Sequence, residues 1–336
     1  MYLRALSYLP AHRPARVIAR LGLPPGYAGN TRALRREMLR ALFFHGIGCE
    51  EFLLFELAGK SEEEKASFLG EFNRAGIYRL ANRRRDLALF HDKWAVYRRF
   101  SDFYGREAIL LRGRSDLPAF AAFLARHGRA FIKPVTGSCG RGALLLSREE
   151  GDADALFARL LPSLPAICEE VILQHGATAR FNPTSLNTLR LQTVCTAEGV
   201  RVFYPFLRMG RYGRVTDNGA AGGVIVPVDA ESGALSAIGR DEAGRYYSEH
   251  PDSRVPFAGA VLPRWEECLR LGERLARRIP TTRSVGWDLA LSEEGWVMVE
   301  ANARGQFIGQ QLCDRRGKRR ELLALCGKSL ATKKDP

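Results

Sequence analysis

Two apolar stretches decide the fold: SVGWDLAL at residues 284–291, and WVMVE at residues 296–300, which Ala301 and Asn302 follow. The polar turn SEEG, residues 292–295, separates them. Short apolar runs bounded by turn residues are typical of β-strands. The segment therefore predicts two adjacent antiparallel strands.

Three polar side chains on these strands predict a metal site. Glu300 and Asn302 are two residues apart and so share a face, where they can converge with Asp288 of the neighbouring strand. Carboxylate and amide oxygens suit magnesium, and no His or Cys, which zinc would favour, lies beside them. A hairpin with ordinary charged ends is the alternative interpretation for each residue taken alone.

A glycine-rich segment upstream predicts a phosphate-binding hairpin. AFIKP at 130–134 and ALLL at 143–146 are predicted strands, and GSCGRG at 137–142 is the loop between them. Glycines let backbone N–H groups approach phosphate oxygens, and Lys133 adds a point charge. The Walker loop and the dinucleotide fingerprint are both excluded, because each opens a helix and here a strand follows. Taken alone, the loop is also explained by plain turn chemistry.

The order of these features resembles the ATP-grasp enzymes. Lys93, Lys133 with its loop, the hinge-like ICEEVI at 167–172 and the acidic triplet follow one another as in that superfamily. Further segments (Gln174-His175, 185–190, 207–210 and 217–223) resemble its sugar-transfer-associated branch, which is akin to glutamate-ligase-like proteins. The resemblance covers roughly residues 92–310. It implies an α+β ATP-grasp fold, in which two α+β subdomains grip ATP, with a helical N-terminal extension.

The resemblance also implies residue roles. Magnesium would be held by Asp288, Glu300 and Asn302, whereas many members' ribose-binding Glu is replaced here by Gln174 and His175. The phosphoryl group and the acyl substrate would face Arg190, Arg208 and Asn218. The residues implied in ATP binding are Lys93, Lys133, Gly137, Ser138, Gly140, Gly142, Glu169, Glu170, Ile172 and His175.

Several of these residues have an alternative interpretation. A lysine beside an aspartate near a helix start, such as Lys93, is usually a solvated surface charge. A lone histidine such as His175 often only satisfies a backbone group. Arg190 lies in the alternating run LRLQT, whose polar positions can simply face water.

The remaining chain predicts three regions: a helical basic region at 1–86, a subdomain with the glycine loop at 87–183, and a subdomain with the metal site at 184–336. Predicted helices cover 31–44, a segment from the Ser61 capping box to Phe72, 87–103 with Lys93, 117–127, 264–279 and 318–330. A strand is predicted at 108–111.

Composition limits the possible classes of protein. No apolar run approaches the roughly 18 residues that span a bilayer. The seven cysteines are scattered, without a Cys-x-x-Cys pair, which indicates reduced thiols. We therefore expect a cytoplasmic protein. The net charge is +14, and residues 1–48 hold eight Arg, one Glu and no Asp or Lys. No nucleic-acid fold signature accompanies this charge, which suits phosphates, an anionic glycan precursor or peripheral contact with a membrane surface.

The function expected from the resemblance is that of an ATP- and Mg²⁺-dependent ligase. It would join a small-molecule carboxylate to an amine through an acyl-phosphate, and the branch name suggests attachment of an amino acid to a sugar or glycan precursor. One alternative is a phosphotransferase that uses the same ATP grip on a hydroxyl acceptor. The other is a nucleotide-regulated binding module.

Overall fold

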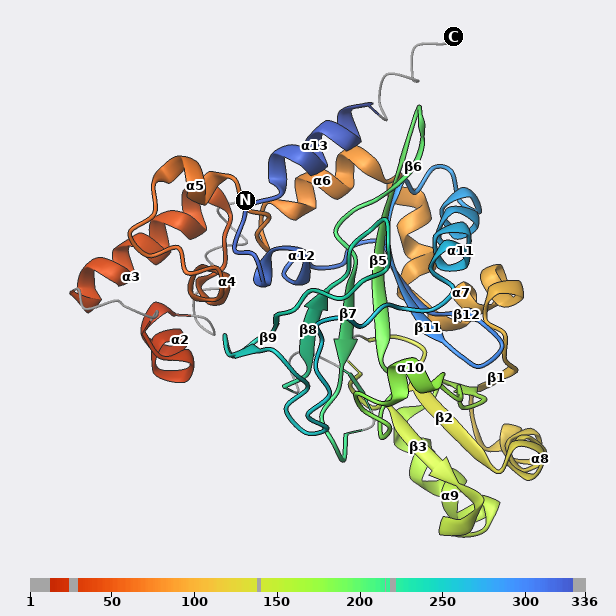
Figure 1. Ribbon diagram of the computed structural model, residues 1–336. Coiled ribbons are helices and arrows are strands. Elements are labelled where there is room, and N and C mark those ends of the chain that lie inside the picture. The colour runs from red at the N-terminus through yellow and green to blue at the C-terminus, as the bar shows by residue number, and fades with distance from the viewer. Residues whose placement is uncertain (1–12, 24–29, 138–139, 215, 218–221, 329–336) are drawn as a thin grey trace.

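The computed structural model describes residues 13–23, 30–137, 140–214, 216–217 and 222–328. Over these ranges it has a helical N-terminal region and two antiparallel sheets (Figure 1). The N-terminal helices are α2 (Pro14–Leu21), α3 (Thr31–Arg40), α4 (Cys49–Leu54), α5 (Glu62–Ala66) and α6 (Arg74–Ala81), and α7 (Lys93–Phe100) leads into the first sheet.

The smaller sheet has the strand order β1-β4-β2-β3 within the described residues. Ala130 and Ile132 on β2 are buried against α8 and α9, while Phe131 and Lys133 alternate to the other face. One face of this sheet is therefore a packed core and the other is free to line a site. The elements are β1 (Ala108–Leu111), α8 (Leu117–His127), β2 (Arg129–Pro134), β3 (Leu144–Ser147), α9 (Ala153–Leu160) and β4 (Ala166–Glu169).

The larger sheet has the order β10-β9-β8-β7-β5-β11-β12 in the described chain, and β6 pairs with β5. Its strands are β5 (Thr188–Thr196), β6 (Gly199–Val202), β7 (Phe206–Met209), β8 (Val224–Pro227), β9 (Gly239–Asp241), β10 (Tyr246–Tyr247), β11 (Ser284–Leu291) and β12 (Trp296–Asn302). The remaining helices are α10 (Gly176–Ala179), α11 (Trp265–Arg277), α12 (Gly309–Leu312) and α13 (Arg319–Lys328).

Strand alternation divides the central strands of this sheet into two faces. Leu189 and Leu191 on β5 and Trp287 on β11 belong to the core that α7 and α11 cover, and Phe100 meets Trp287 edge-on at 5.5 Å. A Cβ on Gly272 of α11 would lie 2.4 Å from Leu191, so only glycine allows this helix to approach the sheet so closely. Thr188, Arg190 and Gln192 of β5, and Asp288 of β11, consequently lie on the opposite face.

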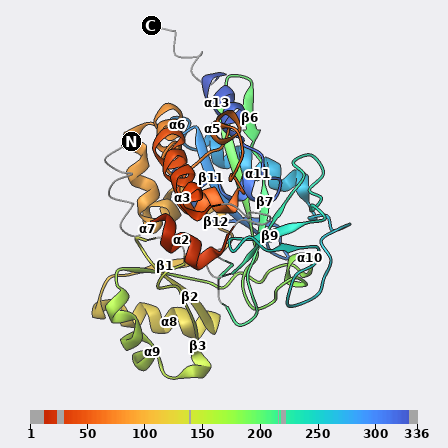
Figure 2. The same cartoon turned by 90° about the vertical axis from the view of Figure 1, so that its left-hand side faces the viewer.

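The helical region is joined to the larger sheet by buried polar contacts. Gln311 of the α12 segment bonds both the N–H and the carbonyl of Leu69, at 2.9 and 3.0 Å. Arg240 of β9 is buried and donates to the Leu54 carbonyl at 2.7 Å and to Glu56 at 2.8 Å. Figure 2 shows these N-terminal helices in front of the larger sheet. The region boundaries at 86/87 and 183/184 stay a prediction.

The predicted strands at 108–111, 130–134, 143–146, 284–291 and 296–300 are confirmed to within two residues at each end. The predicted helices at 117–127, 264–279 and 318–330 are also confirmed, apart from their ends. No described helix is long and apolar enough to cross a membrane.

Three predicted helices differ from the structure. The continuous helix at 87–103 is wrong: a 3₁₀ segment, Arg84–His91, ends before Asp92, which caps α7 by accepting from the Ala95 N–H at 2.9 Å. The helix at 31–44 changes to a π-helical turn at Ala41–His45, and the helix opened by Ser61 ends at Ala66. In each case the apolar periodicity runs past a point where capping or tertiary packing redirects the chain.

Candidate active site

The candidate metal residues lie together because of strand register. Asp288 of β11 is paired with Glu300 of β12, and Gly286 is paired with Asn302. A bulge after Asp288 leaves Val299 as an extra residue on β12, so Val299 and Glu300 both line the same cavity. The predicted convergence of the three side chains is thus what the backbone produces.

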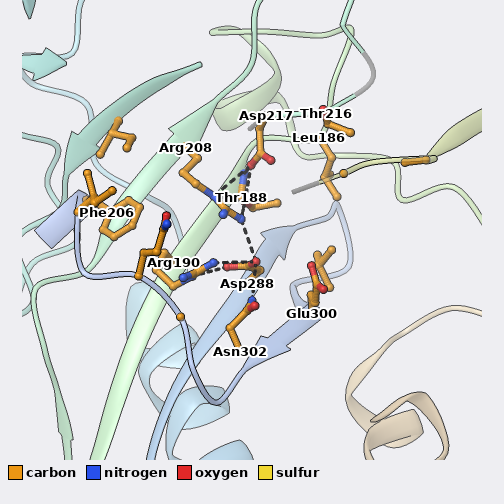
Figure 3. Close-up of a pocket in the computed structure, with 18 of the residues that line it drawn as sticks. Leu186, Thr188, Arg190, Phe206, Arg208, Thr216, Asp217, Asp288, Glu300 and Asn302 are labelled. Atoms are coloured by element: carbon orange, nitrogen blue, oxygen red, sulfur yellow. Dashed lines mark hydrogen bonds and ion pairs between the residues drawn. The ribbon is translucent and has the colours of Figure 1, made fainter. Parts of the chain in front are cut away.

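Asp288 is the centre of a buried arginine network (Figure 3). Arg190 of β5, the register partner of Asp288, donates to its two carboxylate oxygens at 2.5 and 3.1 Å, and Arg208 of β7 approaches it at 3.0 Å. Burial alone would raise the pKa of Asp288, but the two guanidiniums hold it below its usual value. The polar positions of β5 therefore do not face water: Thr188, Arg190 and Gln192 are all buried.

Asp217 extends this network on the side of Arg208. Its carboxylate accepts from the Thr188 N–H at 3.0 Å and from the Thr188 hydroxyl, and it lies 3.6 Å from Arg208. Burial raises its pKa. Neither Arg190 nor Arg208 donates from its NH1 group to any described residue, so each keeps N–H donors for a ligand.

Glu300 lies beside the network in Figure 3 without a hydrogen bond to it. Burial, followed by the nearby Asp288 carboxylate, raises the pKa of Glu300. Among the described residues its nearest cation is Lys93, with Nζ 3.9 Å from Oε1. Lys93 also donates to the Gly137 carbonyl at 2.8 Å, and its side chain is only 16% exposed, so it is not a solvated surface charge.

These donors fit a magnesium ion that also binds phosphate. Glu300 is a half-buried carboxylate whose pKa is raised, its nearest described cation lies 3.9 Å away, and the Asn302 amide is adjacent, so a divalent cation would compensate its charge. Asp288 is a less direct magnesium ligand, because guanidiniums contact both of its carboxylate oxygens and the Asn302 amide donates to Oδ2 at 3.3 Å. No group of three His, Cys, Asp or Glu in the described residues has the geometry to hold a metal by itself.

Lys133 lies where two adjoining cavities meet. One, of about 330 Å³, is lined by the segment that leaves β4, including Glu169, Glu170 and Ile172. The other, of about 370 Å³, contains the arginine network and Glu300. Lys133 lines both cavities and bonds Glu169 at 2.8 Å, and Arg106 bonds the same carboxylate at 3.0 Å.

The glycine loop closes over the second cavity. Gly140 and Ala143 line it, and Gly140 and Gly142 have φ values of +64° and +75°, in the left-handed region that favours glycine. Two predicted site residues, Ser138 of this loop and Asn218, lie outside the described residues.

His175 is not brought to either cavity. Its backbone N–H bonds the Leu291 carbonyl at 2.8 Å, and its Nδ1 accepts from the Ala177 N–H at 3.0 Å as the cap of α10. Its neighbour Gln174 does line the first cavity, although both ends of that side chain bond the 182–187 turn.

Sequence reasoning missed several residues of the second cavity, four of which are charged or polar side chains that bear on its chemistry. Arg74 and Arg304 line the second cavity, as do Glu242 and Thr188. Burial raises the pKa of Glu242, and no described residue donates a hydrogen bond to it or pairs with it. Arg74, Arg304 and Glu242 belong to no motif, since tertiary packing alone brings them to the site. Thr188 lies two residues before Arg190 on β5, so strand alternation could have placed it on the same face as Arg190.

Comparison with known proteins agrees with this arrangement. Residues 154–326, just over half of the chain, match the family described as sugar-transfer associated ATP-grasp. The fold of two sheets around adjoining cavities is that of the ATP-grasp class. The chain belongs to the sugar-transfer associated ATP-grasp family. No curated protein sequence matches it.

Solved structures with similar folds include three enzymes. D-alanyl-alanine synthetase A from Vibrio cholerae has 15% identity and a TM-score of 0.44, over 73% of this chain and 66% of that one. The ATP-grasp ligase PsnB, complexed with minimal precursor, has 15% identity and a TM-score of 0.43, over 76% of this chain and 63% of that one. The ADP complex of N5-carboxyaminoimidazole ribonucleotide synthetase has 11% identity and a TM-score of 0.43, over 66% of this chain and 46% of that one. The chain thus spans between about half and two thirds of their lengths, and likenesses this weak say nothing of its own reaction.

Proposed function

We propose that this chain is an ATP-dependent ligase that joins a carboxylate to an amine through an acyl-phosphate. The observation that carries the proposal is the pair formed by the buried Arg190 and the half-buried Arg208, whose NH1 groups have no described partner, in the same cavity as Glu300. Such fixed donors suit an oxyanion that develops during acyl transfer. Membership of an ATP-grasp family supports ATP as the energy source.

The two cavities divide the substrates between them. We place the adenine against the backbone of residues 169–172, and the phosphates past Lys133 and Lys93 into the second cavity. The glycine loop would cover the phosphates with its N–H groups. Glu300 and Asn302 would hold magnesium, and Asp288 would join them only if Arg208 moved aside. When bound, magnesium would neutralise charge on the β- and γ-phosphates.

The reaction balances as two displacements. In the first, a substrate carboxylate oxygen bonds to the γ-phosphorus, the bond to the bridging oxygen breaks, and ADP leaves. In the second, the amine nitrogen bonds to the acyl carbon, the carbon–oxygen bond breaks, and phosphate leaves. Arg190 and Arg208 stabilise the tetrahedral oxyanion between these bond changes. Glu242, whose pKa burial raises, accepts the proton that the amine loses.

The identity of the substrates follows only from the family description. Its association with sugar transfer supports a sugar or glycan precursor as one substrate, and we propose an amino acid as the other. Both are small polar molecules, which suits a cavity of about 370 Å³ lined by charged side chains together with apolar ones.

Hydroxylamine trapping tests the proposal. A panel of amino acids and sugar acids is incubated with the protein, Mg-ATP and hydroxylamine, and hydroxamate and ADP are measured in parallel. The expected result is a hydroxamate with one acid, abolished in Lys133→Ala. ADP release that requires a hydroxyl acceptor, yields a stable phosphate ester and never gives hydroxamate would replace the ligase by a phosphotransferase. ATP binding without any turnover would indicate a binding module.

A further inference from the structure

Helix α6 and the residue that follows it hold the loop after β12. Arg74 and Tyr78 are four residues apart on one side of α6, and Asn82 comes directly after the helix ends at Ala81, in an extended conformation. They donate hydrogen bonds to the main-chain carbonyls of residues 304, 305 and 303, at 3.1, 2.9 and 3.0 Å. The loop begins directly after Asn302. The N-terminal helical region is therefore built into the candidate active site.

The guanidinium of Arg304, on this loop, has no partner among the residues that the structure describes. Arg304 is exposed and lines the second cavity. No carboxylate among the described residues lies within 4.0 Å of it, and it donates no hydrogen bond to them. An arginine in a cavity with all of its donors available is a receptor for a carboxylate or phosphate group.

Arg74 lines the same cavity and is held in place. Its Nε and NH2 groups bond the Glu71 carbonyl and carboxylate at 3.3 and 2.5 Å, and its NH1 group bonds the Arg304 carbonyl. These three bonds use three of the five N–H donors of a guanidinium, which leaves two for a ligand. Arg74 is thus a fixed donor next to Arg304, whose guanidinium pairs with no described residue.

The two arginines are continuous with the reacting centre. A Cβ built on Gly305 would lie 3.2 Å from the NH1 group of Arg190, so the loop runs directly against that guanidinium. Apolar side chains, Phe206, Ile225 and Ile308, line the same cavity. A single small molecule can therefore reach both Arg190 and Arg304.

We propose that Arg74 and Arg304 form a subsite for a second anionic group of the substrate, a carboxylate or a phosphate distinct from the group that reacts. This inference rests on the proposed function for the identity of the reacting centre. It narrows the substrate class to a molecule with a fixed negative charge beyond its reacting end. It also gives the helical region a direct part in substrate selection.

Isothermal titration calorimetry on the full chain tests the subsite. The protein is saturated with magnesium and a non-hydrolysable ATP analogue, so that the γ-phosphate position is filled, and is titrated with inorganic phosphate and, separately, with succinate. We expect one binding event for at least one anion, weakened about tenfold or more in Arg304→Gln, because a charge-assisted contact contributes about 1.5–3 kcal/mol. Whichever anion binds identifies the group as phosphate or carboxylate.

Arg316→Gln is the matched control, because Arg316 is an exposed arginine outside this cavity. It should bind the anion as the wild type does, and all three proteins should bind the nucleotide analogue equally. The subsite is wrong if neither anion binds the wild type, if Arg304→Gln binds it unchanged, or if the ATP analogue displaces it. Failure of hydroxylamine trapping with anion binding intact would instead overturn the ligase and leave the subsite standing.

Discussion

Replacing each of the two facing carboxylates should affect stability differently: Asp288→Asn should destabilise the fold, and Glu300→Gln should not. Asp288→Asn removes the charge that Arg190 contacts twice and Arg208 contacts once. Arg190 has no other carboxylate within 4.0 Å in the described residues, and its side chain is only 9% exposed. Breaking a buried pair in this way costs about 3–5 kcal/mol. Arg208 is affected less, because Asp217 remains 3.6 Å away.

Glu300→Gln should leave the protein equally or more stable at neutral pH. Burial, followed by Asp288, raises the pKa of Glu300 above that of the unfolded chain, so the folded state binds the proton more tightly. Stability from this group is therefore present below the unfolded pKa and is lost as pH rises through the folded pKa. Glutamine does not ionise, so the free energy of unfolding of Glu300→Gln should fall less than that of the wild type between pH 5 and 8.

Urea unfolding without magnesium or nucleotide separates the two variants. At pH 7.5, Asp288→Asn should unfold at a clearly lower urea concentration with an unchanged slope, and Glu300→Gln should not. Both should lose turnover. Glu294→Gln, at an exposed turn residue, is the control. A wild-type midpoint for Asp288→Asn, or an equal loss for Glu300→Gln, would refute the assignment of Asp288 as the partner of the arginines.

Three further predictions test other parts of the site. Lys133→Met should weaken ADP binding at least tenfold in a fluorescence titration, because it removes the cation shared by both cavities; unchanged affinity would place the phosphates elsewhere. Tyr78→Phe leaves the Gly305 carbonyl without that donor and should cost about 1 kcal/mol, lowering kcat while the KM for ATP is unchanged; a changed KM alone would contradict this. Arg211 lowers the pKa of Asp252 to about 2, so Asp252 should stabilise the fold above its unfolded pKa of about 4 and lose this effect as pH falls towards 2. The melting temperatures of Asp252→Asn and the wild type should therefore differ at pH 7 and converge near pH 2. A difference that stays constant with pH would exclude the ion pair.

Local patterns predicted what depends on local chemistry. The runs around Asp288 and Glu300 gave both strands and their common face, because period-two alternation and a short polar turn determine how a hairpin pairs. The glycines around Gly140 likewise marked a loop, since left-handed φ values favour glycine. The order of these motifs along the chain was enough to indicate the ATP-grasp class.

Other features required long-range contacts that no local pattern encodes. The sequence could not show that Asp288 pairs with two arginines, because β5 and β7 reach β11 only through the strand order of the sheet. The break before Lys93 depends on the Asp92 cap, which competes with an apolar periodicity that would continue the helix. His175 was predicted to bind the cofactor, but the structure uses it to cap a helix instead.

The sequence by itself determined the class of fold, the two-stranded carboxylate hairpin and the glycine loop, because each follows from alternation, turn chemistry or the order of residues within a short segment. Only the tertiary structure decided which charges meet. It placed Arg74 of α6 beside Arg304, 230 positions later in the chain, and left Arg304 unpaired among the described residues. Electrostatic energy depends on distance and burial in three dimensions, and these are fixed only when the helical region packs against the larger sheet.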